Sequence, residues 1–98
     1  MNIKLKQTNK NGKYGFINES GVIVIPCQWK AVGYFADGLA QVQDENDKWG
    51  VIDKNGKVVI PCRWKAVGYF ADGLAQVQDE NDKWGVIDET GKVVEQCQ

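Results

Sequence analysis

The sequence predicts an all-β fold made of three tandem antiparallel β-meander units, with a period of 35 residues and little or no helix. Residues 29–53 recur letter for letter at 64–88, and a looser third copy opens the chain. The apolar runs are short, rich in valine, isoleucine and aromatic residues, and separated by turn-forming residues about every 8 to 12 positions, as in β-strands. We therefore expect one single repeat array over residues 1–98, with units at about 1–27, 28–62 and 63–98.

Three strands are expected in each unit. In the middle unit they are GLAQVQ at 38–43, KWGVID at 48–53 and KVVIP at 57–61, and the first unit opens with a looser counterpart, IKLKQ at 3–7. The first two segments alternate with period two, so that Val51 and Ile52, for example, face opposite sides of the sheet. Strands that are adjacent in sequence then pair in antiparallel fashion.

The turns between these strands have a recognisable chemistry. The tetrapeptides NESG, DKNG and DETG place Gly21, Gly56 and Gly91 where a type I turn followed by a bulge needs a positive φ. The acidic loops at 44–48 and 79–83 contain Asp and Asn, which form side-chain turns with their own backbone. Each loop is therefore predicted to close a solvent-exposed hairpin rather than to bind calcium, because its carboxylates are consecutive and no distal ligand follows.

The connectors at 28–38 and 63–73 are predicted to be irregular or to hold a short strand, and each ends in a tight Asp-Gly turn. They also carry the candidate ligand-binding residues, Trp29, Tyr34, Trp64 and Tyr69, because an array can align repeated rings on one surface. Exposed rings of this kind bind sugars or proteins. The alternative is that they form the core, since so small a protein needs large apolar side chains there.

Stacking explains why the unit is repeated. Val58 and Val59 point to opposite faces of one meander, which therefore needs a neighbour to bury both. The ends must differ because they meet water. The last unit has Glu95 and Gln96 where the others have Ile-Pro, which predicts a polar cap.

The motifs GKYGFIN, DKWGVIDKNGKVVIP and FADGLAQV resemble the bacterial WG (or KWG) repeats, and the match extends over nearly the whole chain. The WGR domain is a different module, and valine follows both Trp-Gly pairs where that domain has arginine. The resemblance implies a β-rich module with no assigned catalytic residues.

Composition excludes several functions. A hydrophobic content of 43% with 26% charged residues indicates a globular chain, and the net charge of -1 argues against nucleic acid as a partner. No apolar run is long enough to span a membrane, and the N-terminus has no signal-peptide core, so we expect no membrane association and a cytoplasmic location. Cys27, Cys62 and Cys97 are then expected to be reduced thiols.

The chemistry of a catalytic site is missing. The chain has no histidine, which removes the usual base and the commonest transition-metal ligand. We therefore predict no enzyme activity, no cofactor and no metal site. The expected function is a non-catalytic binding or structural module that mediates protein-protein interaction or self-association, as a dimer or by domain swapping. Two alternatives stay open: a carbohydrate-binding module that uses the connector rings, and an engineered or recently duplicated repeat without a selected function.

Overall fold

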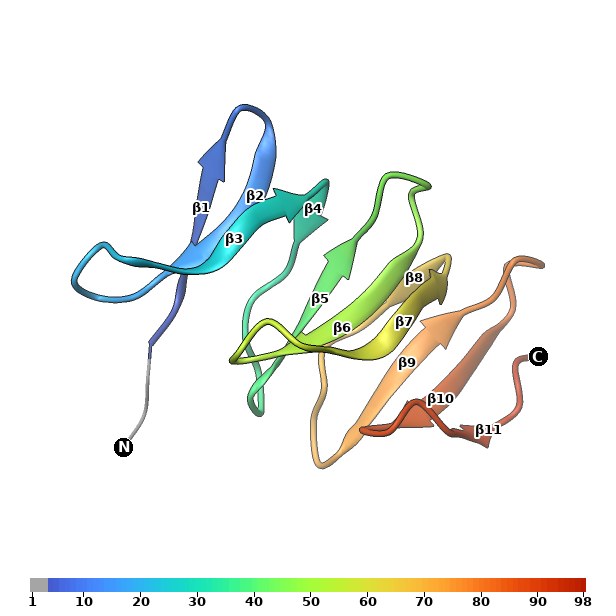
Figure 1. Cartoon of the computed structure of the whole chain (residues 1–98). Coiled ribbons are helices and arrows are strands. Elements are labelled where there is room, and N and C mark those ends of the chain that lie inside the picture. Colours follow the sequence, from blue (N-terminus) through green and yellow to red (C-terminus); the bar gives the residue numbers. More distant parts are fainter. Residues whose placement is uncertain (1–3) are drawn as a thin grey trace.

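The computed structural model describes residues 4–98 and, over that range, contains strands and no helix, which confirms the all-β prediction (Figure 1). The strands are β1 (Lys6–Lys10), β2 (Lys13–Ile17), β3 (Ile23–Trp29), β4 (Ala31–Val32), β5 (Leu39–Gln43), β6 (Trp49–Asp53), β7 (Val58–Trp64), β8 (Ala66–Val67), β9 (Leu74–Gln78), β10 (Trp84–Asp88) and β11 (Val93–Glu95). The short strands β4 and β8 lie in the two connectors.

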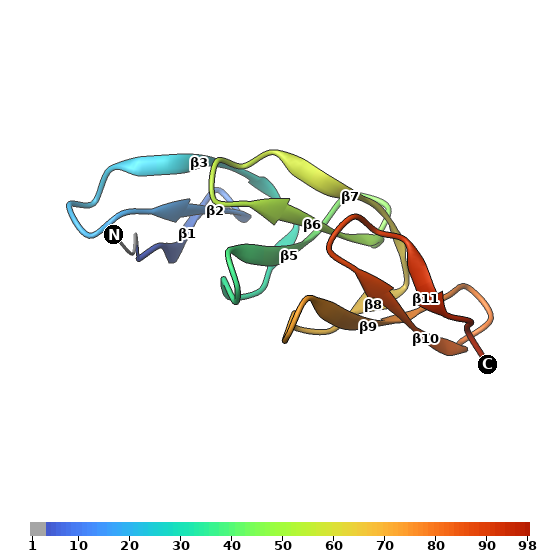
Figure 2. The ribbon, with the colours of Figure 1, turned by 90° about the horizontal axis from the view of Figure 1, so that it is seen from below.

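The strands form three antiparallel sheets, each from one uninterrupted stretch of chain. The N-terminal sheet has the order β1-β2-β3, the middle sheet β4-β5-β6-β7 and the C-terminal sheet β11-β10-β9-β8. The sheets follow one another in chain order, so the two ends of the chain lie at opposite ends of the array (Figures 1 and 2). No strand passes from one sheet into another among the described residues.

The predicted turn glycines adopt the expected conformation, because Gly21, Gly56 and Gly91 all have φ values between 83° and 89°. In the middle unit the Gly56 amide donates to the Asp53 carbonyl at 3.0 Å, and the Asp53 amide donates to the Lys57 carbonyl at 2.9 Å. This pattern is a type I turn closed by a bulge. The Asp-Gly turns also form, since both Asp37 (54°) and Gly38 (77°) have positive φ, as a type I′ turn requires.

The acidic loops are hairpin loops held by their own aspartates. Asp44 Oδ1 accepts hydrogen bonds from the amides of Asn46 and Lys48 at 2.9 and 3.0 Å. Asp47 takes the left-handed position of this turn with φ 64°, and its carboxylate pairs with Lys30. The carboxylates therefore serve the turn and a surface ion pair, and the same contacts recur at Asp79 and Asp82.

The first strand of the chain does not lie where the repeat pattern predicts it. The expected strand at 3–7 begins outside the described residues, and the strand that forms is β1 at Lys6–Lys10. The cause is a shorter loop: Asn11 and Gly12, with φ 56° and 82°, make a two-residue turn where the other units have five loop residues. Lys6 consequently pairs with Ile17, in the place that Ala40 and Ala75 take in the other sheets.

The core lies between neighbouring sheets as two clusters of buried residues. One consists of Phe16, Ile25, Ala40, Val42 and Ile52, from the N-terminal and middle sheets. The other consists of Val51, Ile60, Trp64, Phe70, Ala75, Val77 and Ile87, from the middle and C-terminal sheets. The adjacent residues Val51 and Ile52 thus belong to opposite clusters, which confirms their predicted alternation. Within residues 4–98, a core cluster covers each face of the middle sheet and one face of each outer sheet.

Candidate functional site

Groups that could perform catalysis or hold a metal do not come together in the described part of the chain. No cluster of three or more cysteine, aspartate or glutamate side chains able to hold a metal ion occurs within residues 4–98, and the chain has no histidine. No helix of that part is long and apolar enough to cross a membrane. The groups that could bind a ligand or partner in this part of the chain are therefore aromatic rings, amides, apolar side chains and charged side chains at the surface.

The four predicted ligand-binding rings do not form one row. Trp64 is buried, with 4% of its surface exposed, and Trp29 packs half-buried against the first core cluster. Tyr34 and Tyr69 are 67% and 55% exposed, and their rings stack on each other with centroids 6.4 Å apart. The structure therefore brings the two tyrosines together at the surface and leaves the tryptophans in packing positions.

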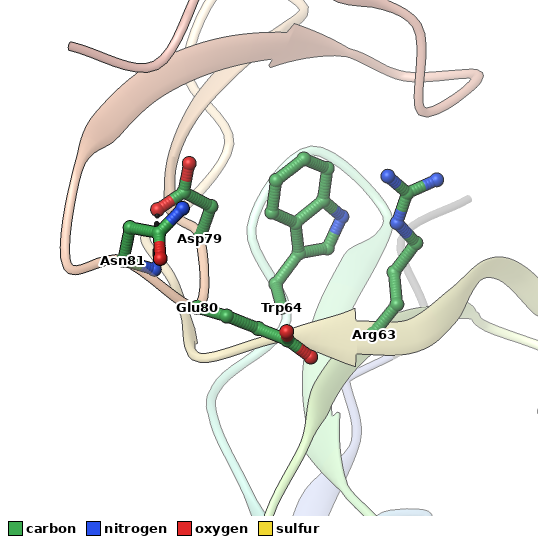
Figure 3. Close-up of a pocket in the computed structure, with 5 residues that line it drawn as sticks. All are labelled: Arg63, Trp64, Asp79, Glu80 and Asn81. Carbon is green, nitrogen blue, oxygen red and sulfur yellow. Dashed lines mark hydrogen bonds between the residues drawn. The ribbon is translucent and has the colours of Figure 1, made fainter.

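Trp64 lines a polar hollow between the end of β7 and the loop that joins β9 to β10. Its ring lies between Arg63 on one side and Asp79 and Asn81 on the other, and the Glu80 side chain runs below it in the view of Figure 3. The Arg63 guanidinium stacks at 4.8 Å from the ring centroid, a cation-π contact. The loop side of the hollow carries the carboxylates of Asp79 and Glu80, so the hollow is lined by charges of both signs.

A second hollow, a groove of about 370 Å³, runs beside Tyr69. Short strands β4 and β8 supply much of its wall, and Trp49 and Gln41 line it from the middle sheet. Gln41 is the buried polar side chain of the described core, and its amide nitrogen donates to the Val67 carbonyl at 3.3 Å. The groove thus lies at the seam between two units, and the hydrogen bond from Gln41 to Val67 joins the units there.

The seams between units are built from contacts that recur at both. Gln7 Nε2 donates to the Val32 carbonyl at 3.3 Å, as Gln41 Nε2 does to Val67 one unit later. Ion pairs cross the same seams, from Lys13 to Glu45 and, at 3.5 Å, from Lys48 to Glu80. Turn glycines meet core isoleucines in both, Gly56 against Ile25 and Gly91 against Ile60. One geometry therefore joins each unit to the next.

The C-terminal sheet has the same residues with which the middle sheet contacts its neighbour at the second seam, but here they face solvent. We call the surface formed by Leu74, Gln76, Trp84 and Val86 the terminal face. Its counterparts in the middle sheet are Leu39, Gln41, Trp49 and Val51, of which Gln41 and Val51 are buried and the other two half-buried. In the terminal face Leu74 is 44% exposed, Trp84 is 47% exposed, Gln76 is exposed and Val86 is half-buried, so each is more exposed than its counterpart. The same residues are thus covered by a neighbour in one sheet and uncovered in the next.

The terminal face was not predicted from the sequence, because the predicted ligand-binding residues all lie in the connectors. The signal was nevertheless present. A residue whose copy is buried at an internal seam is uncovered wherever no neighbouring unit packs against it, unless the sequence changes there. Of the buried residues in the middle sheet's copy of this face, Ile60 is the one that is replaced, by Glu95, and Glu95 lies on β11 at the edge of the C-terminal sheet.

Two equivalent glycines should respond differently to alanine. A Cβ on Gly33 would collide with the side-chain amide of Gln41, whereas the nearest atom to a Cβ on Gly68 is the Gln76 carbonyl oxygen at 3.6 Å, an ordinary contact. We expect Gly33→Ala to lower the free energy of unfolding by about 1 kcal/mol, because Gln41 must leave its hydrogen bond to Val67. Gly68→Ala should be close to neutral. Urea denaturation of both variants measures the difference, and equal losses would contradict it.

Cys62 should be a slow nucleophile. Burial, with the Asp44 carboxylate adding to the effect, raises the pKa of the Cys62 thiol from 9.0 to about 11. Only the thiolate reacts, so at about pH 8 we expect alkylation of Cys62 to be roughly a hundredfold slower in the folded chain than in urea. The raised pKa also means that this thiol stabilises the fold below pH 9 and ceases to do so as the pH rises toward 11. Peptide mapping after timed iodoacetamide treatment gives the rate; similar rates in both states would contradict the burial of the thiol.

Comparison with known proteins agrees with this architecture. Neither the curated proteins nor the solved structures include a match to the chain. The family model described as "WG containing repeat" matches twice, at residues 14–49 and 49–84, in tandem and with the period of the sheets. These matches extend over most of the chain and meet at Trp49, the first residue of a Trp-Gly pair. The chain therefore belongs to the WG-containing repeat family.

Proposed function

We propose that the chain is a non-catalytic interaction module that binds a protein partner through the terminal face. The observation that supports this is the contrast between two copies of one surface: Gln41 is 6% exposed against its neighbour, while the identical Gln76 faces solvent. The apolar and amide groups that form an interface on the middle sheet are suited to form an interface on the C-terminal sheet as well.

The composition of the terminal face fits a protein partner. It combines a tryptophan and two aliphatic side chains with one amide, and tryptophan is enriched at the centre of protein interfaces. Full burial of a leucine side chain contributes about 1.5–3 kcal/mol. Lys83 is exposed beside Trp84 and would form part of a polar rim. The absence of histidine from the chain supports a role without acid-base catalysis.

Site-specific photo-crosslinking tests the proposal. A photoreactive amino acid at Leu74, introduced into the full chain in living cells, should give a discrete protein adduct that mass spectrometry identifies. The matched control is the same group at Lys54, which is exposed in the turn between β6 and β7. Adducts that are equal at the two positions, or absent at Leu74, would contradict binding through the terminal face.

A second candidate, carbohydrate binding, is favoured by the exposed tyrosine pair. Tyr34 and Tyr69 stack at the surface, and Tyr69 borders the groove that also contains Trp49. Flat rings of this kind offer apolar contact to a sugar at low entropic cost. Glycan titration should then change tryptophan fluorescence and raise the melting temperature, and Tyr69→Ala should remove both effects. If no glycan changes either signal in the wild-type chain, this candidate fails.

A further inference from the structure

Formal charge is distributed unevenly along the array. Residues 1–29 hold four lysines and one glutamate, a net charge of +3. Residues 65–98 hold three lysines and seven carboxylates, a net charge of -4, and residues 30–64 are balanced. The overall charge of -1 therefore hides an array with a basic first unit and an acidic last unit. Two such chains attract each other end to end and repel each other when like ends meet.

Two replacements at the ends match this polarity. Strand pairing places Glu95 opposite Val86, in the position that Ile60 takes opposite Val51. It places Lys6 opposite Ile17, in the position that Ala75 takes opposite Ile87. Ile60 and Ala75 belong to one buried cluster across the internal seam. Glu95 therefore takes the position of Ile60 at the C-terminal end of the array. Lys6 takes the position of Ala75 at the N-terminal end.

We propose that the terminal face docks the N-terminal sheet of a second copy of this chain, head to tail, with Glu95 of one copy paired with Lys6 of the next. This inference rests on the proposed function, since it names the partner of the same face. The contact continues the stacking direction of the array and places oppositely charged residues where the internal seam has two members of one buried cluster. Because the contact is heterologous, it generates rings or growing chains of copies rather than one symmetric dimer.

The contact is weaker than the internal seams. The first unit has the turn Asn11-Gly12 where the others have the loop that holds Glu45 or Glu80, so Lys83 gains no equivalent of the Lys48–Glu80 pair. Thr8 also occupies the place of Val42 and Val77 in the strand register. Association should therefore depend on concentration and, because the oppositely charged ends of two copies attract each other through the solvent, on salt.

Sedimentation velocity of the full chain tests the association. Between about 10 µM and 1 mM protein at about 50 mM salt, the mean mass should rise, and about 500 mM salt should weaken the association roughly tenfold or more. A chain that stays monomeric at the highest concentration in low salt overturns the inference. It would leave the proposed function standing if the Leu74 crosslink still captured a different protein, so the two failures are distinguishable.

Charge reversal tests the geometry. Lys6→Glu and Glu95→Lys should each abolish association, while an equimolar mixture of the two variants, or the double variant, should restore it. Lys54→Glu makes the same charge change in the middle unit and should have no effect. Each variant must keep the wild-type circular dichroism spectrum. If Lys6→Glu leaves association intact while Leu74→Lys removes it, two terminal faces pair symmetrically and the head-to-tail arrangement is wrong.

Discussion

Gly50→Ala is expected to lower the free energy of unfolding by about 3 kcal/mol or more, a large part of the stability of so small a protein. A Cβ on Gly50 would collide with the Ile60 carbonyl oxygen and lie 2.8 Å from both the Pro61 carbonyl carbon and the Cys62 nitrogen. All three are backbone atoms of the neighbouring strand, so no side chain can rotate away. The register between β6 and β7 shifts at this point, and the strands approach closely only because Gly50 has no side chain.

Urea denaturation followed by tryptophan fluorescence measures the loss, and Gly68→Ala is the matched control because its Cβ meets only an ordinary contact. The glycines of the other two Trp-Gly or Tyr-Gly pairs face the same crowding: a Cβ on Gly15 would lie 2.7 Å from the Pro26 carbonyl, and one on Gly85 would lie 2.7 Å from the Glu95 oxygen. An unchanged midpoint for Gly50→Ala would mean that the bulge relaxes, and the physical account of the repeated glycine would be wrong.

Ile60→Glu is expected to separate the C-terminal sheet from the rest of the array. Ile60 is buried in the second core cluster and contacts the turn at Gly91. A carboxylate left there without a partner costs on the order of 3–5 kcal/mol. Because a unit contacts only its neighbours, the C-terminal sheet should lose its protection first. Hydrogen exchange should therefore accelerate over β9 and β10 before it does over β1 and β2.

Val58→Glu, an exposed position on the same strand, is the matched control and should change stability by less than about 0.5 kcal/mol. The deficit of Ile60→Glu should also narrow at acidic pH, since the neutral acid costs less to bury than the carboxylate. Uniform acceleration of exchange across all three sheets would show that the array unfolds as one unit and would contradict the separation.

Most of the fold was predicted from short-range sequence patterns, namely the alternation of apolar residues and the identity of the turn residues. Period-two alternation located β5 and β6 closely, and the turn glycines Gly56 and Gly91 took the conformation that their positions demanded. Proline was less informative. The expected strand at 57–61 runs on through Pro61 to Trp64, because the bulge next to Pro61 accommodates a residue without an amide proton.

The candidate site could not be read from local patterns. Trp49 and Trp84 stand in identical surroundings of sequence, as do Leu39 and Leu74, yet only the second of each pair is exposed. What differs is whether a neighbouring sheet packs against them within residues 4–98, and the surrounding sequence does not encode that. The N-terminal strand was misplaced for a related reason: one short turn, Asn11-Gly12, shifts the register while leaving the neighbouring motif recognisable.

Because each sheet is folded from one uninterrupted stretch of chain, the number of sheets can change without re-threading any of them. Recombination between the gene segments for residues 29–53 and 64–88 adds or removes a whole period, and every remaining hydrogen-bond ladder keeps its register. Unequal crossing-over can therefore lengthen or shorten this protein in a single evolutionary step. An added unit would meet its neighbour through the same residues that form the existing seams.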